Sequence, residues 1–374
     1  MQLSSQVTAD GRNYGIDLLR IVSLIMITLL HTLGHGGILR SAGVLSRAYK
    51  AAWLLEIGAY CAVNCYGLIS GFVGYGRKQR CSSLLCLYAQ VLFYTVITTA
   101  LFRVWRPDTV TQETVLMAVF PFAYDTYWYF TAYFCLFFFM PFLNALVEKL
   151  DRGMLRKMLI SAFLIFSVLP TVFHEDIGKA GSGYTFLWLA ILYTVGAYIK
   201  KYNLHAGKSG YRPILCYLAC VLITWLFKMV TETLEQGIPV ELQHGDYLVS
   251  YISPTIVICA IALLLFFADL KCGRKLIPFI RFFAPVSFGA YLLHDEPLIR
   301  EYLLHDSLTG YLSFRTVKML PAVIATALLI WLIGSLVDRV RLELFRLLKV
   351  SAACEFLGDK ISALFRQPAF EKEC

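Results

Sequence analysis

The stretch Gly15-Ile-Asp17-Leu-Leu-Arg20-Ile-Val-Ser-Leu-Ile-Met-Ile-Thr-Leu-Leu-His31 decides how this chain folds. Most of its side chains are apolar, and the run is hydrophobic enough to cross a bilayer. Yet it carries Asp17, Arg20 and His31. An ionisable group inside a membrane costs roughly 2.5–3.5 kcal/mol on insertion scales, and it is retained where it faces a bundle interior or a wet cavity. The stretch therefore predicts a membrane helix with a functional polar face.

Arg20 and His31 are expected on the same face of this helix. They are eleven residues apart, and at about 100° per residue this separation returns to within roughly 20° of the starting face. With a rise of about 1.5 Å per residue, the two side chains stand roughly 16 Å apart along the axis. The spacing predicts a fixed cation and a titratable imidazole lining one interior channel.

The composition of the whole chain agrees with a membrane protein. The 374 residues are 58% hydrophobic and 16% charged, with a mean hydropathy of +0.65, whereas soluble domains carry about 25% charged residues. We expect an all-α, multi-pass helical bundle in the cell membrane. Ten spans are predicted, at residues 16–34, 52–73, 83–102, 127–147, 157–173, 184–200, 213–231, 248–268, 280–299 and 319–337.

Two details refine this prediction. Pro278, Arg281 and Pro285 interrupt the ninth segment, which predicts a broken or tilted helix, and a short interfacial helix is expected within residues 107–126. The polar start of the chain shows no short apolar core and no cleavage site, so we expect the first span itself to direct insertion.

Lysine and arginine predict the orientation. Most of the 34 basic residues fall in the N-terminus, the even-numbered connections and the C-terminus, so the positive-inside rule puts both termini in the cytoplasm. We expect a cytoplasmic segment at residues 1–14, one membrane domain at 15–338 and a basic tail at 339–374. The tail is predicted to form an amphipathic helix on the inner leaflet, with a disordered tail as the alternative.

The net charge of +9 comes from these basic residues at the membrane boundary. The sequence has no contiguous basic domain, so we expect no nucleic acid among the partners, whereas membrane lipids are expected. The chain has 11 cysteines and no CxxC pair, and most of the cysteines lie within predicted spans. They are interpreted as small apolar side chains that fill space. We expect neither a disulfide framework nor a metal site.

Two further clusters are candidates for chemistry. Arg77-Lys-Gln-Arg80 follows the second span, and it is either an orientation signal or an anion site, because arginine pairs with phosphate in a bidentate manner. His294 is followed directly by Asp295 and Glu296. A carboxylate beside a histidine can orient the imidazole, although a polar helix end is the alternative interpretation.

Other polar residues receive simpler interpretations. Glu56 and Asn64 are eight residues apart and are expected to share a face of the second span, and Lys228 is expected to snorkel to the membrane surface. The remaining histidines are interpreted as surface residues without ligand spacing: His35, His174, His205, His244 and His305.

The order of these motifs resembles the acyltransferase-3 family of integral membrane acyltransferases. The resemblance rests on five stretches that run from about residue 12 to 337: Gly15 to Arg20, His31, Ser70-Gly71 followed by Arg77 to Arg80, Trp128 to Asn144, and Phe288-Gly-Ala-Tyr291-Leu-Leu-His294. Each motif is loose alone, but their order across ten spans is fairly specific.

The resemblance implies transfer of an acyl group, usually acetyl, from cytoplasmic acyl-coenzyme A. The acceptor would be a hydroxyl of a cell-surface glycan or its lipid-linked precursor, reached directly or through a separate extracellular acyl-accepting protein. By position, His31 would be catalytic with Arg20, Arg77 and Arg80 would bind the coenzyme, and Asp17 and His294 complete the candidate catalytic set.

His31 would act as a general base or carry the acyl group covalently, and Arg20 would hold phosphate or stabilise oxyanion charge. The alternative function is a transporter or flippase for a polar solute or glycan, with Arg20, His31, Glu56 and Asn64 as a midplane site.

Overall fold

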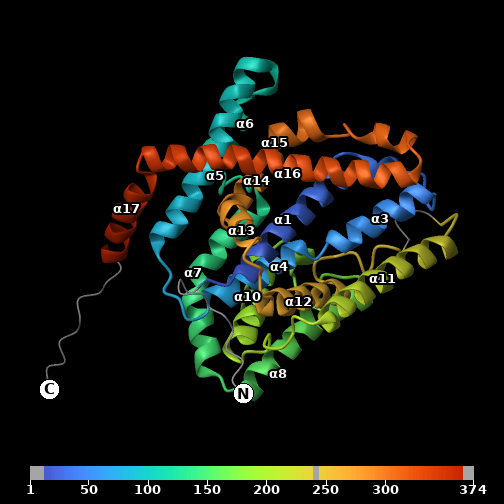
Figure 1. Cartoon of the computed structure of the whole chain (residues 1–374), viewed down its shortest axis with the longest axis horizontal. Coiled ribbons are helices and arrows are strands. Elements are labelled where there is room, and N and C mark those ends of the chain that lie inside the picture. Colours follow the sequence, from blue (N-terminus) through green and yellow to red (C-terminus); the bar gives the residue numbers. More distant parts are fainter. Residues whose placement is uncertain (1–11, 239–243, 365–374) are drawn as a thin grey trace.

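The structure is a computed structural model that describes residues 12–238 and 244–364 (Figure 1). It is 77% helical with no strands in these ranges. Most of the expected N-terminal segment and the end of the expected tail lie outside the described residues. The helices are α1 (Tyr14–Gly34), α2 (Ile38–Ser41), α3 (Arg47–Ala59), α4 (Ala62–Gly74), α5 (Cys81–Trp105), α6 (Gln112–Val119), α7 (Trp128–Lys149), α8 (Arg152–Phe163), α9 (Leu169–Phe173), α10 (Phe186–Lys201), α11 (Tyr211–Leu234), α12 (Pro254–Asp269), α13 (Ile277–Phe283), α14 (Ser287–His294), α15 (Pro297–Ile299), α16 (Thr316–Leu347) and α17 (Val350–Leu364).

The all-α, multi-pass architecture is confirmed, and each of the ten predicted spans contains helix, although residues 248–253 of the eighth precede α12. The number of spans stays a prediction. In the described part of the chain, eight helical segments are long and apolar enough to cross a membrane. The two exceptions are α10 and α12, which have 16 residues each. A helix of that length measures about 24 Å, less than the roughly 30 Å of a bilayer core. The cytoplasmic location of both termini stays a prediction.

The first helix lies at the centre of the bundle. It contacts α3, α4, α12, α14 and α16. Its N-terminus is fixed by Asn13, whose side chain accepts a hydrogen bond from the Ile16 amide at 3.1 Å and donates one to the Ala268 carbonyl of α12 at 2.8 Å. Because these helices surround α1, its polar face lies against protein and not against lipid. Ionisable side chains in a membrane helix require such a location.

Glycines let α4 and α10 cross at very short range. A Cβ atom on Gly71 would lie 1.8 Å from the Tyr193 carbonyl oxygen, and one on Gly196 would lie 2.0 Å from the Leu68 carbonyl oxygen. Small residues permit such close backbone approach, which is a main source of packing energy between membrane helices. This crossing fixes the position of α4, which carries part of the cavity described below.

The ninth predicted span is broken, as the sequence indicated. Pro278 lies in the first turn of α13, and Pro285 lies in a 3-10 turn, Ala284–Val286, that separates α13 from α14. The expected helix within residues 107–126 is present as α6, which projects from the end of α5 at the top of Figure 1.

The last long helix runs beyond its predicted end. The helix α16 follows the connection between the ninth and tenth predicted spans and continues without interruption to Leu347. The expected domain boundary after residue 338 therefore falls inside one helix. Asp338 and Arg341, just beyond residue 337, are both buried and form an ion pair, so these charges are satisfied within protein. The following helix, α17, packs against α5 (Figure 1).

Candidate active site

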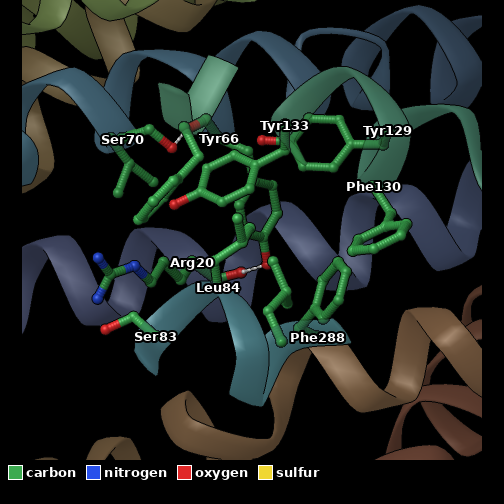
Figure 2. A pocket seen from close by; sticks show the side chains of 12 residues that line it. Arg20, Tyr66, Ser70, Ser83, Leu84, Tyr129, Phe130, Tyr133 and Phe288 are labelled. Atoms are coloured by element: carbon green, nitrogen blue, oxygen red, sulfur yellow. Dashed lines mark hydrogen bonds between the residues drawn. The ribbon is translucent and has the colours of Figure 1, made fainter. Parts of the chain in front are cut away.

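A cavity of about 280 Å³ opens beside Arg20. It lies among α1, α4, α5, α7 and α14, and aromatic side chains make up half of its lining. Figure 2 shows the guanidinium of Arg20 and the hydroxyl of Ser83 at one end of the group, with Phe130 and Phe288 at the other. The lining residues are Arg20, Tyr66, Ile69, Ser70, Ser83, Leu84, Leu87, Tyr129, Phe130, Tyr133, Phe137 and Phe288.

Asp17 holds Arg20 at the edge of this cavity. The buried Asp17 carboxylate accepts from Arg20 Nη1 at 2.6 Å and from Arg12 Nε at 2.5 Å. The Arg20 carbonyl accepts a hydrogen bond from the Tyr66 hydroxyl at 2.9 Å. Since Asp17 and His31 are fourteen residues apart, they are separated by roughly 21 Å along α1. Asp17 is therefore placed to position Arg20, and it does not contact the imidazole.

The Arg77–Arg80 cluster lies at the same end of the bundle as Arg20. Both side chains are exposed in the connection between α4 and α5, and Arg80 directly precedes the first residue of α5. Ser83, three residues further on, lines the cavity. The cluster therefore stands at the cavity's polar end, where an anion at Arg77 or Arg80 could extend toward Arg20.

At the other end of α1, His31 meets His294. The Nδ1 atom of His31 lies 3.0 Å from Nε2 of His294, although 263 residues separate them in sequence. The Nδ1 atom of His294 lies 2.6 Å from the carbonyl oxygen of Ala290. A carbonyl oxygen only accepts, so His294 Nδ1 carries a proton and donates it.

This pair fixes the tautomer of His31. When His294 is neutral, its Nε2 atom is an acceptor, so the proton between the rings belongs to His31 Nδ1. The Nε2 atom of His31 then carries the lone pair of the neutral ring. The arrangement is the geometry expected of a positioned proton acceptor.

A carboxylate and a third histidine complete the cluster. Asp295 Oδ1 lies 3.7 Å from His31 Nδ1, 3.6 Å from His35 Nε2 and 3.3 Å from Arg300 Nη1. Burial alone would raise the pKa of Asp295, but the neighbouring imidazoles and the Arg300 guanidinium hold this pKa well below its ordinary value. Asp295 is therefore a buried anion facing two histidines.

His35, interpreted from the sequence as a surface residue without ligand spacing, is 37% exposed but lies beside His31 and Asp295. Its ring centroid lies 4.8 Å from that of His31. The segment after α15 fixes this end of α1, because the Asp306 amide donates to the His35 carbonyl at 2.9 Å and the Leu308 amide donates to the Gly36 carbonyl at 3.1 Å. The i, i+4 spacing of His31 and His35 was the sequence signal that pointed to this neighbour.

Two aromatic rings of α14 lie between the cavity and the histidines. Phe288 lines the cavity, whereas His31 does not. The ring of Tyr291 is 5.7 Å from that of Phe288 and 6.2 Å from that of His31, between centroids. The expected channel is thus divided: Arg20 lines the cavity, and His31 lies behind the rings at its far end.

Glu296 ends the cluster on the side of α15. It is buried, and its carboxylate accepts hydrogen bonds from the amides of Leu298 at 2.8 Å and Ile299 at 3.0 Å. Burial raises the pKa of Glu296 to about 7, against the opposing effect of the two amides. The interpretation of this segment as a polar helix end applies to Glu296, while His294 and Asp295 face α1.

Three other expectations are settled by burial and partners. Lys228 does not snorkel: its side chain is 1% exposed and its Nζ lies 2.6 Å from Glu232 Oε1 and 2.5 Å from Asp246 Oδ1. His205 is buried rather than at the surface. Asn64 donates to the Tyr251 carbonyl and accepts from the Trp188 indole, and it does not line the Arg20 cavity.

Comparison with known families matches residues 13–337 to the family described as an acyltransferase domain. The chain belongs to this acyltransferase family. The match covers nearly the whole chain and confirms the resemblance drawn from its motifs. Comparisons with curated proteins and with solved structures found no match. Membership in this family and the eight apolar helical segments together support a membrane acyltransferase with several spans.

Proposed function

We propose that this acyltransferase moves an acetyl group from cytoplasmic acetyl-coenzyme A to a hydroxyl of a cell-surface polysaccharide or its lipid-linked precursor, in the cell membrane. One observation carries the proposal. A cavity begins at a fixed arginine and ends at Phe288, which lies six residues, or roughly 9 Å along α14, before one of an oriented pair of imidazoles. This is the arrangement that an anionic donor with a long thioester arm requires.

The basic side chains receive the donor. Arg77 and Arg80 bind coenzyme phosphates outside the cavity, because guanidinium groups match phosphate in charge and geometry. Arg20, held by Asp17, attracts the remaining negative charge at the entrance. The apolar walls formed by Leu84, Leu87 and the aromatic rings accept the thioester arm.

His31 performs the proton transfer. Its Nε2 atom takes the proton of the acceptor hydroxyl while the hydroxyl oxygen attacks the thioester carbonyl carbon. The tetrahedral intermediate collapses, the carbon–sulfur bond breaks, and the thiolate of coenzyme A takes the proton back from the imidazolium. His294 is a positioning residue that holds the tautomer, and Asp295 stabilises the transient imidazolium charge.

Phe288 and Tyr291 control the approach of the thioester to His31. Because both rings stand between the cavity and the imidazole, one of them changes rotamer when the arm reaches His31. A small acyl group passes with little rearrangement, which supports acetyl over longer groups.

The decisive experiment combines binding and transfer with purified protein. Acetyl-coenzyme A should raise the melting temperature, because a ligand that binds the folded state stabilises it. In vesicles that contain the acceptor glycan, labelled acetyl should appear on the glycan. If no acyl-coenzyme A stabilises the protein and a polar solute crosses the vesicle membrane instead, the chain is a transporter and the proposal fails.

Rapid quenching separates the two chemical routes. Direct transfer leaves no labelled protein, whereas a covalent acyl-His31 intermediate would carry label that His31→Gln removes. If transfer to the glycan needs an added extracellular fraction, a separate acyl-accepting protein completes the reaction.

A further inference from the structure

The three side chains at the far end of α1 form a set of metal-binding donors. One nitrogen of His31, one nitrogen of His35 and one carboxylate oxygen of Asp295 all lie within 4.8 Å of one another. His31 lies in the last turn of α1 and His35, at i+4, is the C-cap residue of that helix with a helical backbone conformation. This is the spacing by which helical histidine pairs bind zinc. Two imidazoles and one carboxylate are also a donor set found in catalytic zinc sites.

The distances between the donors are close to those of a tetrahedral site. Zinc–nitrogen and zinc–carboxylate bonds of about 2.0–2.2 Å place neighbouring donors roughly 3.3–3.5 Å apart. Asp295 Oδ1 lies 3.6 Å from His35 Nε2 and 3.7 Å from His31 Nδ1. All three donors lie within 4.8 Å of one another. Closing the set around an ion therefore needs a shift of a few tenths of an ångström at Asp295 and of up to roughly 1.5 Å between the two imidazoles, which rotation about side-chain bonds supplies.

The site is accessible but not fully open. The side chains of His31, His35 and Asp295 are 21%, 37% and 7% exposed, respectively. The buried carboxylate supplies negative charge, and the more exposed His35 lies on the side from which an ion would enter. Arg300 also faces Asp295, at 3.3 Å, and its positive charge opposes a cation. His294 Nε2, 3.0 Å from His31 Nδ1, is the nearest additional donor.

We propose that His31, His35 and Asp295 bind a divalent transition-metal ion, Zn²⁺ in particular, and that this binding switches off the acyl transfer proposed above. The sequence predicted no metal site, because the spacing of His35 was not connected with Asp295. The switch follows from the tautomer: catalysis needs the proton on His31 Nδ1 and a free Nε2.

Metal binding requires the opposite arrangement. The ion takes the lone pair of His31 Nδ1, so the single proton of the neutral ring must sit on Nε2. The proton acceptor is then lost, and the hydrogen bond to His294 is broken. Zinc and the acceptor hydroxyl therefore exclude each other at His31. The metal-binding part stands without the acyltransferase proposal, whereas the inhibition rests on it.

Calorimetric titration of the purified, metal-free full chain with Zn²⁺ tests the binding. We expect one ion per chain, and at least a tenfold loss of affinity in His35→Asn. His174→Asn is the matched control, because His174 is an exposed histidine on another connection. Absence of Zn²⁺ binding, or equal binding by His35→Asn and the wild type, would overturn the proposed site.

Activity measurements test the switch separately. Zn²⁺ should inhibit transfer by the wild type, a chelator should restore it, and His35→Asn should need at least tenfold more Zn²⁺ for the same fractional inhibition. Activation by Zn²⁺ would refute the inhibition while leaving the site. If wild-type protein binds Zn²⁺ but transfers no acyl group under any condition, the proposed function fails and the metal site remains.

Discussion

Two ionic clusters border α14, one buried and one partly exposed, and they differ in how completely their polar atoms are paired. On one side, Asp338 accepts from Arg341 Nε at 2.6 Å, Arg341 Nη2 at 2.9 Å, the Tyr94 hydroxyl at 2.8 Å and Gln90 Nε2 at 3.1 Å. It packs so closely on α14 that a Cβ on Gly289 would lie 2.1 Å from its oxygen.

The other cluster, around His31, is open. Within residues 12–238 and 244–364, His31 Nδ1 has a hydrogen-bonding partner, but no such partner is found for Nε2. A buried charge with every bond satisfied locks a helix pair together, whereas an oriented group with a free lone pair can carry out chemistry. The comparison predicts that the Asp338 cluster supports stability and that the His31 cluster supports activity.

Removing the His31 imidazole should have the largest effect on activity. His31→Gln keeps a polar side chain of similar length but cannot accept a proton, so we expect acyl transfer to fall by about 10²–10⁴-fold. The melting temperature should change little, because His31 is partly exposed. The measurement is labelled acetyl transfer alongside a thermal melt. A His31→Gln protein that retains full activity would place the chemistry elsewhere.

Breaking the Asp338 cluster should lower the stability of the fold. Asp338→Ala leaves the Arg341 guanidinium buried without its carboxylate, and loss of one partner of a buried pair costs about 3–5 kcal/mol. We expect a low yield of folded protein and a lower unfolding midpoint. Asp338→Ala combined with Arg341→Leu should recover part of the loss. If the single variant is as stable as the wild type, the contrast between the clusters is mistaken.

The buried Glu296 carboxyl should make the stability of the fold depend on pH. In the folded protein the Glu296 carboxyl stays protonated up to about pH 7, whereas in the unfolded chain it loses its proton near pH 4.5. As pH rises through this window the unfolded state ionises first, so stability is lost, and the loss is complete above about pH 7. Melts from roughly pH 5 to 8 should show a stability that depends less on pH in Glu296→Gln than in the wild type, by about 2–3 kcal/mol over this range. Parallel curves would mean that Glu296 ionises normally.

Changing Arg77 and Arg80, at the basic end of the cavity, should weaken binding of the acyl donor. Arg77→Ala with Arg80→Ala removes two phosphate partners, so we expect the apparent KM for the acyl donor to rise about tenfold with a small change in kcat. Arg152→Ala with Lys157→Ala is the control, because these residues form a basic pair at the start of another span. Equal effects of the two double variants would reduce Arg77 and Arg80 to an orientation signal.

The sequence predicted the fold because hydrophobic runs and proline breaks are local properties. Each of its ten predicted segments contains helix, eight of them in helices long and apolar enough to span a membrane, and it located the break at Pro285. It placed the end of the last span at residue 337, whereas the helix α16 continues to Leu347 and carries the charged residues Asp338 and Arg341. Only the three-dimensional packing against Tyr94 reveals that these charges are satisfied inside the protein.

The candidate site was predictable only in part, for the same reason. His31 and Arg20 stood out because each is ionisable within an apolar run. The partners of Lys228 come partly from a distant connection, through Asp246, so the sequence favoured snorkelling. The meeting of His31 with His294 is a contact across the bundle, and no local pattern encodes the 3.0 Å distance.

The smallest expected effect concerns the ring that separates the cavity from the open cluster. Phe288→Ala removes a wall of the cavity without touching His31 or Arg20. We expect activity with acetyl-coenzyme A to change less than threefold, while the ratio of kcat/KM for butyryl- to acetyl-coenzyme A rises about tenfold, because two added methylenes gain room. Phe283→Ala is the matched control: its ring packs on Trp331, 4.8 Å away between centroids, and does not line the cavity. If both variants leave the ratio unchanged, the acyl group does not travel past Phe288, and the link between the cavity and the His31 cluster must follow another path.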